Sequence, residues 1–138
     1  MKIRFVVILL FVIIFILGCN QNGGTTYQDE GSPSNPVLVT VGVTHHGTIG
    51  SYGSSYYTFV AAENGSHTIG LTNTQSDLSW ELYDSTHAYM EDCDDYMVPG
   101  PNDEIKQTSS LTNGADYYLL VDEWDYVAGT FDLTITYP

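Results

Sequence analysis

The residues that could do chemistry are concentrated in one segment, Met90 to Lys106, which reads MEDCDDYMVPGPNDEIK. It contains six carboxylates and one cysteine, and a second acidic run, DEWD, begins at Asp122. Calcium takes about six to eight oxygen ligands, several of them carboxylates, from a backbone that can wrap around the ion. The candidate calcium ligands are Asp92, Asp94, Asp95, Asp103, Glu104 and Asp122.

A well-solvated acidic loop accounts for the same segment, because runs of like charge usually face water. The segment also has no glycine at the position where an EF-hand loop turns sharply. The sequence leaves both alternatives open. If calcium binds, we expect the weak affinity of extracellular modules, roughly 0.1 to 1 mM.

Cys93 lies in the middle of the acidic segment. A reactive thiol needs nearby positive charge to lower its pKa, whereas its neighbours Asp92 and Asp94 are negative. We therefore expect no redox or nucleophilic role for this residue. The alternatives are a small buried side chain, or an unpaired cysteine that can form an intermolecular disulfide.

Two aromatic residues, Trp124 and Tyr126, occupy the acidic stretch DEWDYV. Their rings would suit contact with a sugar ring or with a partner chain, so they are candidate ligand-binding residues. A loop tryptophan can also fold back and cover the end of a sheet. No catalytic residue is predicted, because the sequence has no GxSxG motif and no arrangement that places a base beside a nucleophile. His45 and His46 are adjacent and would point to opposite faces of a strand.

The first nineteen residues are typical of an export signal. Lys2 and Arg4 precede an unbroken apolar run, residues 5–17, which has the length of a signal-peptide core. The run ends in ILGC, which resembles the lipobox of bacterial lipoproteins. This resemblance implies cleavage after residue 18 and lipidation of Cys19. We therefore expect a protein anchored in the cell envelope by lipid, at the outer membrane or the cell surface rather than the inner membrane, since no aspartate follows Cys19.

Charge and composition define the rest of the chain. All 17 acidic residues lie after Cys19 and only one basic residue, Lys106, does, so the mature chain would carry a charge of −16 with histidines neutral. Such a chain has no basic patch for nucleic acid. Residues 19–35 are polar and rich in Gly, Ser and Asn, which predicts a flexible tether. Residues 36–138 have the length of a single domain.

From Pro36 onward, apolar residues alternate with polar ones, which is the pattern of half-buried β-strands. The turn signals between the runs favour an all-β sandwich or barrel. One of them, ENGS at residues 63–66, predicts a two-residue hairpin, because Asn-Gly accepts a type I′ turn. The alternating residues are Val37, Val39, Val41 and Val43; Tyr57 and Phe59; Ile69 and Leu71; Leu78, Trp80 and Leu82; Tyr117, Leu119 and Val121; and Phe131, Leu133, Ile135 and Tyr137.

The ordered motifs of this region resemble the bacterial pre-peptidase C-terminal domain. A valine-rich first strand is followed by GTI and YYTF, then by SDLSWELYD, then by GADYYLLV and a closing GTFDLTI. The resemblance implies an antiparallel β-sandwich of jelly-roll type with about eight strands. It also implies a module of exported proteins, some of which bind calcium and some of which bind matrix polymers such as collagen.

The sequence therefore predicts a lipid-anchored, non-catalytic binding or adhesion module of the cell envelope, stabilised by calcium if the acidic residues form a site. Its expected partners are the membrane, through the lipid anchor, and an extracellular polymer or an envelope protein. The alternative is a structural spacer or an accessory subunit of an envelope or secreted complex, with no ligand of its own.

Overall fold

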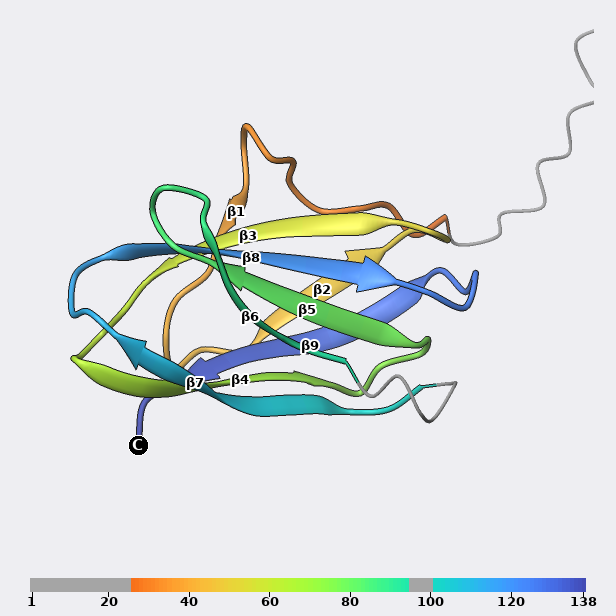
Figure 1. The fold of residues 1–138 in the computed structure, drawn as a ribbon. Coiled ribbons are helices and arrows are strands. Elements are labelled where there is room, and N and C mark those ends of the chain that lie inside the picture. The colour runs from red at the N-terminus through yellow and green to blue at the C-terminus, as the bar shows by residue number, and fades with distance from the viewer. Residues whose placement is uncertain (1–25, 95–100) are drawn as a thin grey trace, which may run out of the picture.

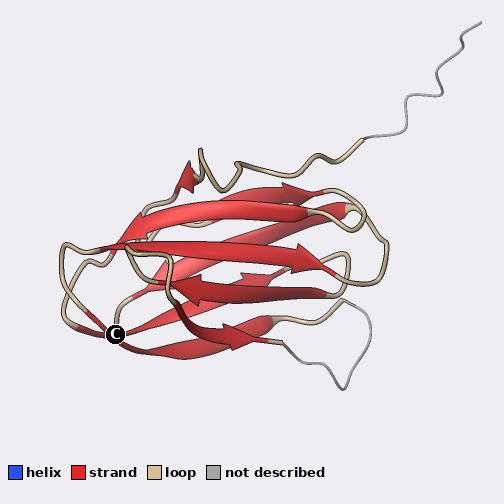
Figure 2. Cartoon of the chain, turned by 45° about the horizontal axis from the view of Figure 1, so that its top comes forward, coloured by secondary structure: helices blue, strands red, loops and turns tan. Residues whose placement is uncertain are grey.

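A computed structural model describes residues 26–94 and 101–138. Within these ranges the chain forms nine strands and no helix, in two sheets packed face to face (Figure 1 and Figure 2). The strands are β1 Val37–Leu38, β2 His45–Ile49, β3 Ser54–Val60, β4 Gly65–Thr72, β5 Leu78–Tyr83, β6 Tyr89–Cys93, β7 Glu104–Leu111, β8 Asp116–Glu123 and β9 Gly129–Thr136. The all-β sandwich that the sequence predicted is confirmed.

The order of the strands is that of a jelly roll. One sheet runs β1-β3-β8-β5-β6 and the other runs β2-β9-β4-β7. Without the short β1, each sheet has four antiparallel strands, and strands adjacent in the sequence mostly lie in different sheets or are not neighbours. β1 pairs with β3 in parallel over two residues, so the valine-rich stretch predicted as a full first strand is mostly irregular.

The predicted hairpin at ENGS is wrong. β3 and β4 flank this segment, but they belong to different sheets. Asn64 does not adopt the positive φ that a type I′ turn requires, and only Gly65 does, at 128°. The chain uses these residues to cross from one sheet to the other, because β3 pairs with β8 and β4 pairs with β7 and β9.

The core lies between the two sheets and contains the residues that the alternation placed inward. Trp80, Tyr57 and Phe59 are fully buried in the five-stranded sheet, opposite Phe131 and the aliphatic residues of the other sheet. Burying such a side chain contributes roughly 1.5–3 kcal/mol, so these rings supply much of the stability. Tyr137 is an exception to the predicted alternation, since 43% of its side chain is exposed beyond the end of β9.

The two open sides of the sandwich are closed by polar contacts. On one side Lys106 of β7 lies 3.3 Å from the carboxylate of Glu91 of β6 and donates to the backbone oxygen of Asp92. On the other side the segment 28–30, which the sequence assigned to the tether, lies against β2 and β3. Thr48 donates to the oxygen of Gln28, and Tyr56 donates to the oxygen of Glu30. The packed part of the molecule therefore begins before Pro36.

Candidate functional site

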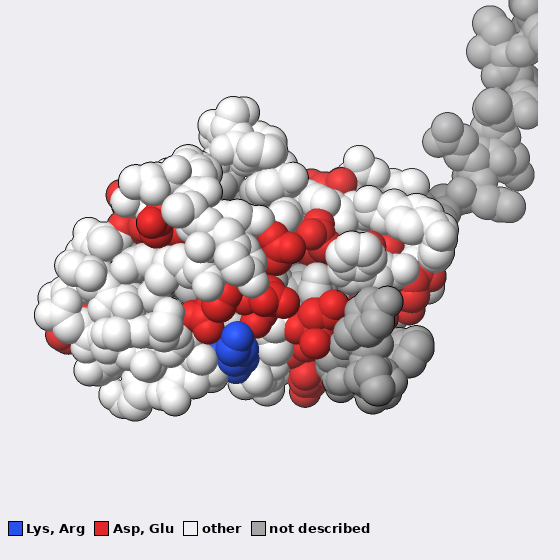
Figure 3. Space-filling view, in the orientation of Figure 1, with Lys and Arg blue, Asp and Glu red and all other residues white. Residues whose placement is uncertain are grey.

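The outward face of the five-stranded sheet carries rows of aligned side chains. Strand register places Thr58, Tyr118, Tyr83 and Tyr89 in one row across β3, β8, β5 and β6. The next row contains Tyr56, Leu120, Glu81 and Asp92. Because side chains two residues apart share a face, these rows form a continuous surface with aromatic rings at one end and carboxylates at the other. Figure 3 shows the carboxylates spread across this side of the molecule beside a single basic side chain.

Part of this face is hollowed into a cavity of about 160 Å³, which we call the tyrosine groove. Its walls are almost entirely apolar and include Tyr56, Tyr83, Tyr118, His87, Pro33 and Pro36. The prolines come from the loop before β1 and the histidine comes from the loop between β5 and β6; both loops stand at the same end of the sheet (Figure 1). A groove of this volume is smaller than the roughly 300–1,000 Å³ of sites that enclose a whole small molecule.

The loop from Asp84 to Ala88 holds His87 against the groove. The Asp84 carboxylate accepts hydrogen bonds from the backbone and hydroxyl of Thr86 and from the backbone of Ala88. These bonds hold the pKa of Asp84 below its usual value, with the Thr86 hydroxyl as the main cause. His87 has a positive φ of 63° and its ring stacks on Tyr118 at 4.2 Å. A non-glycine residue in this strained conformation often marks a functional position.

Two phenol groups on this face, those of Tyr83 and Tyr89, donate hydrogen bonds to carboxylates. Tyr83 donates to Glu81, and this bond raises the pKa of Tyr83 to about 12. Tyr89 donates to Asp92, and this bond raises the pKa of Tyr89 to about 12. The ring of Tyr83 therefore lines the groove while its hydroxyl group is directed to a neighbour on the sheet, and Tyr89 lies edge to face beside Tyr83.

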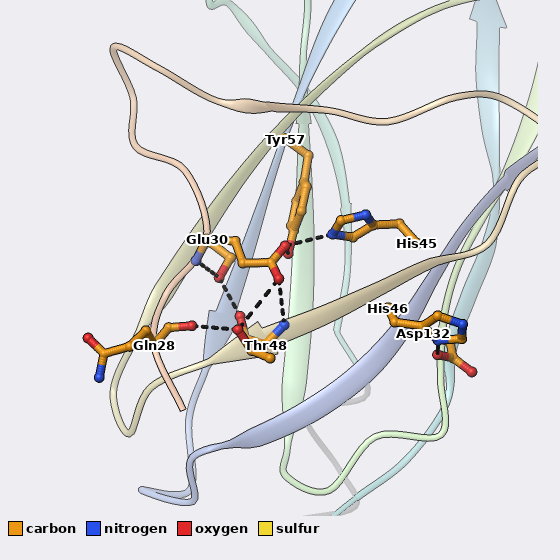
Figure 4. Close-up of polar contacts among 8 residues, drawn as sticks. Gln28, Glu30, His45, His46, Thr48, Tyr57 and Asp132 are labelled. Atoms are coloured by element: carbon orange, nitrogen blue, oxygen red, sulfur yellow. Dashed lines mark hydrogen bonds and ion pairs between the residues drawn. The ribbon is translucent and has the colours of Figure 1, made fainter. Parts of the chain in front are cut away.

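Behind the groove, Glu30 connects the N-terminal segment to the sandwich (Figure 4). One carboxylate oxygen lies 2.6 Å from Nε2 of His45 and accepts a bond of 3.1 Å from the hydroxyl of Tyr57. The other accepts from the backbone N–H of Thr48 at 3.2 Å. Burial first, and then the negative charge of Glu30, raise the pKa of Tyr57. This network fixes the segment that leads to the groove's proline loop.

The other histidine of β2 lies on the opposite face, as predicted. Nδ1 of His46 is 2.5 Å from the carboxylate of Asp132, which also accepts from Asn73 at 2.6 Å. The bonds from Asn73 and His46 lower the pKa of Asp132. In the described ranges the histidine rings hydrogen-bond to Glu30, Asp132 and the backbone oxygen of Gly65.

Trp124 and Tyr126 lie outside the groove, in the β8–β9 loop at the other end of the molecule. Their side chains are 59% and 65% exposed. Nε1 of Trp124 donates to the hydroxyl of Ser79 at 2.9 Å, and the ring of Tyr126 packs edge to face on Tyr52. Their role as ligand-binding residues stays a prediction, and the structure separates them from the groove.

The described candidate calcium ligands lie on β8 and around the ends of β6 and β7. Asp122 lies on the outward face of β8 beside Ser54, and burial raises the pKa of its carboxyl group. Glu104 is buried at the start of β7, next to Cys93. Asp92 is on β6, Asp94 and Asp103 lie beyond the ends of β6 and β7, and Asp95 falls outside the described residues. Among residues 26–94 and 101–138, no group of three or more acidic, histidine or cysteine side chains could hold a metal ion. Calcium binding stays a prediction.

Cys93 is partly buried and its Sγ donates to the carboxylate of Glu104 at 3.4 Å. Burial and the neighbouring Glu104 raise the pKa of Cys93 to about 12. The thiol is therefore protonated at neutral pH, in line with the unreactive residue expected from its acidic neighbours.

Cys19 and the apolar run before it lie outside the described residues, so signal cleavage and lipidation stay predictions. In the part of the chain that the structure covers, there is no helix with the length and hydrophobicity needed to span a bilayer.

The tyrosine groove was not predicted from the sequence. It combines residues from β3, β5 and β8 and from two loops, and these become neighbours only in the jelly-roll order. The signal that could have found it is tyrosine at the polar positions of alternating strands, in YYTF, LYD and DYYL. An aromatic ring on the solvent side of a strand is exposed unless something covers it.

Comparisons with known proteins support the fold. No family model and no curated protein matches this chain. Among solved structures, it resembles the pre-peptidase C-terminal domain of collagenase from Bacillus anthracis, with 20% identity and a TM-score of 0.58. The match covers 77% of this chain and 99% of that domain. It confirms the sandwich fold that the sequence motifs implied.

A second solved structure overlaps less well. The g-type lysozyme inhibitor PliG from Aeromonas hydrophila is 16% identical, with a TM-score of 0.47. That match covers 72% of this chain and 98% of the inhibitor.

Proposed function

We propose that this protein is a non-catalytic binding module, anchored in the cell envelope by a lipid on Cys19, that uses the tyrosine groove to hold an extended polymer outside the membrane. The observation that carries the proposal is the groove itself: an apolar hollow framed by three tyrosines, a histidine and two prolines on the outward face of a sheet. Aromatic rings exposed in a group on a soluble protein are commonly a binding surface.

The volume of the groove favours a polymer over a free small molecule. About 160 Å³ accommodates one ring or one side chain, whereas whole ligands occupy roughly 300 Å³ or more. A chain that inserts one residue in the groove can extend over the rest of the outward face and gain further contacts there. This matches the exported adhesion module that the sequence predicted.

The chemistry of the lining favours a proline-containing polypeptide over a sugar. Sugar rings need hydrogen-bond partners for their hydroxyl groups, and the lining is almost entirely apolar. The phenol of Tyr83 at the groove already donates to Glu81. Aromatic-lined grooves recognise polyproline II segments, whose extended shape costs little entropy to bind. The acidic surroundings would further favour a neutral or basic chain over an acidic one.

The test is binding of the soluble chain, residues 20–138, to fluorescent proline-rich peptides and to a triple-helical Gly-Pro-Pro peptide, with cellulose and peptidoglycan as polysaccharide controls. Tyr118→Ala should weaken binding by about fivefold or more, because stacking on one ring contributes on the order of 1 kcal/mol or more. Tyr126→Ala, a matched exposed tyrosine outside the groove, should leave the affinity unchanged.

Two results would count against the groove. Loss of binding in Tyr126→Ala but not in Tyr118→Ala would move the ligand site to the β8–β9 loop. Absence of binding to any polymer, together with copurification of one envelope protein, would favour the alternative role as a spacer or accessory subunit.

A further inference from the structure

Four exposed apolar side chains lie on two loops at one end of the sandwich, and we call them the aromatic tip: Tyr52 and Tyr126, whose rings touch, with Val127 and with Trp124, whose Nε1 donates to Ser79. Their exposed fractions are, in that order, 55%, 65%, 44% and 59%. Tyr52 belongs to the β2–β3 loop and the other three to the β8–β9 loop. Single exposed apolar residues are ordinary, but a cluster of this kind usually marks a surface that something covers.

The aromatic tip is held in place by hydrogen bonds beneath it. The buried carboxylate of Glu123 accepts from the backbone N–H groups of Tyr52, Asp125 and Val127 at 2.6, 2.8 and 2.9 Å. The hydroxyl of Ser51 donates to the backbone oxygen of Tyr126 and so joins the two loops.

Two of these rings belong to residues whose backbone conformation is energetically unfavourable. Tyr52 and Tyr126 both have positive φ angles, 55° and 71°. Strain of this kind persists where the surrounding structure enforces it, and it clusters at functional sites. The hydrogen bonds of Glu123 and Ser51 hold both loops in this conformation, so the tip is a built feature of the fold.

The aromatic tip lies at the end of the molecule where the described chain begins. Asp29 accepts from the backbone N–H of Gly50, which leads into the β2–β3 loop, and its carboxylate fills the space beside Gly53. In Figure 1 the chain enters at the end where β2 and β8 finish, and the C-terminus lies at the opposite end. Thr26 is seven positions from Cys19, with six residues between them, a reach of at most about 25 Å.

We propose that the aromatic tip rests in the headgroup layer of a zwitterionic phospholipid bilayer, the same membrane that holds the lipid on Cys19. The inference rests on the proposed anchoring and adds an orientation to it. A short tether confines the tip to the immediate neighbourhood of the membrane. Tryptophan and tyrosine, with an apolar ring and one polar group, are the residues that concentrate at the membrane–water boundary.

Charge selects the kind of lipid. Asp125 and Asp29 flank the tip, and the one basic residue of the described chain, Lys106, lies on the β6–β7 side. An anionic bilayer attracts basic segments and repels acidic ones, so these two carboxylates would keep the tip away from anionic lipid. The tyrosine groove lies toward the other end of β8, six residues from Trp124 at Tyr118, so a membrane-bound tip leaves the groove about 20 Å farther out.

The experiment attaches the domain to vesicles through its own N-terminal cysteine. The chain from Cys19 to Pro138 contains all nine strands and the whole core, and Cys93→Ser leaves Cys19 as its single thiol. Cys19 is coupled to phosphatidylcholine vesicles that carry a small fraction of maleimide lipid, with acyl chains that are either plain or brominated near the headgroup. Bromine quenches tryptophan only at short range, and Trp80 is fully buried in the core, so a loss of emission reports Trp124.

We expect brominated vesicles to quench most of the Trp124 emission, and Trp124→Phe to leave only the unquenched signal of Trp80. A chain with Cys19→Ser and a cysteine added after Pro138 holds the opposite end at the membrane, and its emission should not change. Replacing part of the phosphatidylcholine with phosphatidylglycerol should reduce the quenching of the Cys19-coupled chain.

Unchanged emission of the Cys19-coupled chain on brominated vesicles would overturn the proposal. Equal quenching from either attachment point would overturn it too, because the tether would then not set the orientation. The chemical coupling bypasses natural lipidation, and the groove is tested in solution without membranes. A failure here is therefore distinguishable from a failure of the proposed anchoring or of polymer binding.

Discussion

At the scale of single residues, many carboxylates of this acidic chain act as hydrogen-bond acceptors. Glu30 joins the N-terminal segment to β2 and β3, and Glu123 holds the two loops of the aromatic tip. Glu91 accepts hydrogen bonds from both the backbone N–H and the hydroxyl of Ser109. The sequence predicted either calcium ligands or solvated charge for residues of this type. It could not reveal these acceptor roles, because several of the donors are distant in the sequence: Thr48 is 18 residues from Glu30 and Tyr52 is 71 residues from Glu123.

The Cys93 thiol gives a prediction that depends on pH. Its pKa is raised to about 12 by burial and by the hydrogen bond to Glu104, so the reactive thiolate is scarce in the folded protein. Alkylation by iodoacetamide should be far slower than for an unfolded control, and should keep accelerating through the mildly alkaline range without reaching a plateau. Because the folded pKa exceeds the unfolded one, the stabilising effect of the neutral thiol is present below the unfolded pKa and disappears as pH rises through the folded value.

Glu104→Gln tests how much Glu104, beside burial, contributes to the raised pKa of Cys93. Removing the negative charge beside Sγ should lower the pKa of Cys93 and speed alkylation, as measured by mass spectrometry of the intact protein under native conditions. Glu63→Gln, an exposed glutamate in the β3–β4 crossover, is the matched control and should not change the rate. A Cys93 thiol that reacts as fast in the folded protein as in the unfolded control would refute the assignment.

At the scale of elements, inward-facing positions could be predicted and strand partners could not. Leu78, Trp80 and Leu82 alternate in the sequence and are all buried in β5, since period two is a local property of the chain. ENGS looks like a hairpin for equally local reasons, yet it connects two sheets. The pairing depends on which strands bury each other's apolar faces, and that is decided by distant segments. The tyrosine groove escaped prediction for the same reason.

A substitution at Gly53 tests whether the N-terminal segment that packs against β2 and β3 is part of the domain. A Cβ at this position would lie 1.8 Å from the carboxylate of Asp29 and 2.7 Å from the backbone oxygen of Gly50. Gly53→Ala should therefore displace Asp29 and cost about 1–3 kcal/mol, the range for overpacked sites. Urea unfolding measures the loss, and limited proteolysis should cut the released segment near residues 26–31 sooner than in the parent protein.

Gly129→Ala is the matched control for this substitution. Its Cβ would lie 2.9 Å from the Cβ of Gln75, so this substitution also crowds a neighbour but does not contact Asp29. It should leave proteolysis at the N-terminal segment unchanged. If Gly53→Ala unfolds at the same urea concentration as the parent protein and resists proteolysis equally, the segment is not docked as described.

At the scale of the whole molecule, the calcium prediction can be checked without assigning a site. If the acidic residues bind calcium weakly, thermal unfolding near 5 mM calcium should occur several degrees higher than in EDTA, because a ligand at ten times its Kd adds about 1.4 kcal/mol. Magnesium at the same concentration should have less effect, since it prefers smaller, more rigid sites. Equal unfolding temperatures in calcium, magnesium and EDTA would leave the carboxylates with only the structural roles seen here.

The position of the last strand has a consequence for how the molecule forms. β9 lies inside its sheet, between β2 and β4, so that sheet stays divided until residues 129–136 are available. β3 likewise cannot form its antiparallel pair until β8 is available, more than fifty residues later in the chain. Pairing between distant segments slows folding, because the loop must close before its contacts form. A chain synthesised from its N-terminus therefore cannot complete either sheet until β8 and β9 are available, so on the proposed export route its strands would pair only after most of the chain has crossed the membrane.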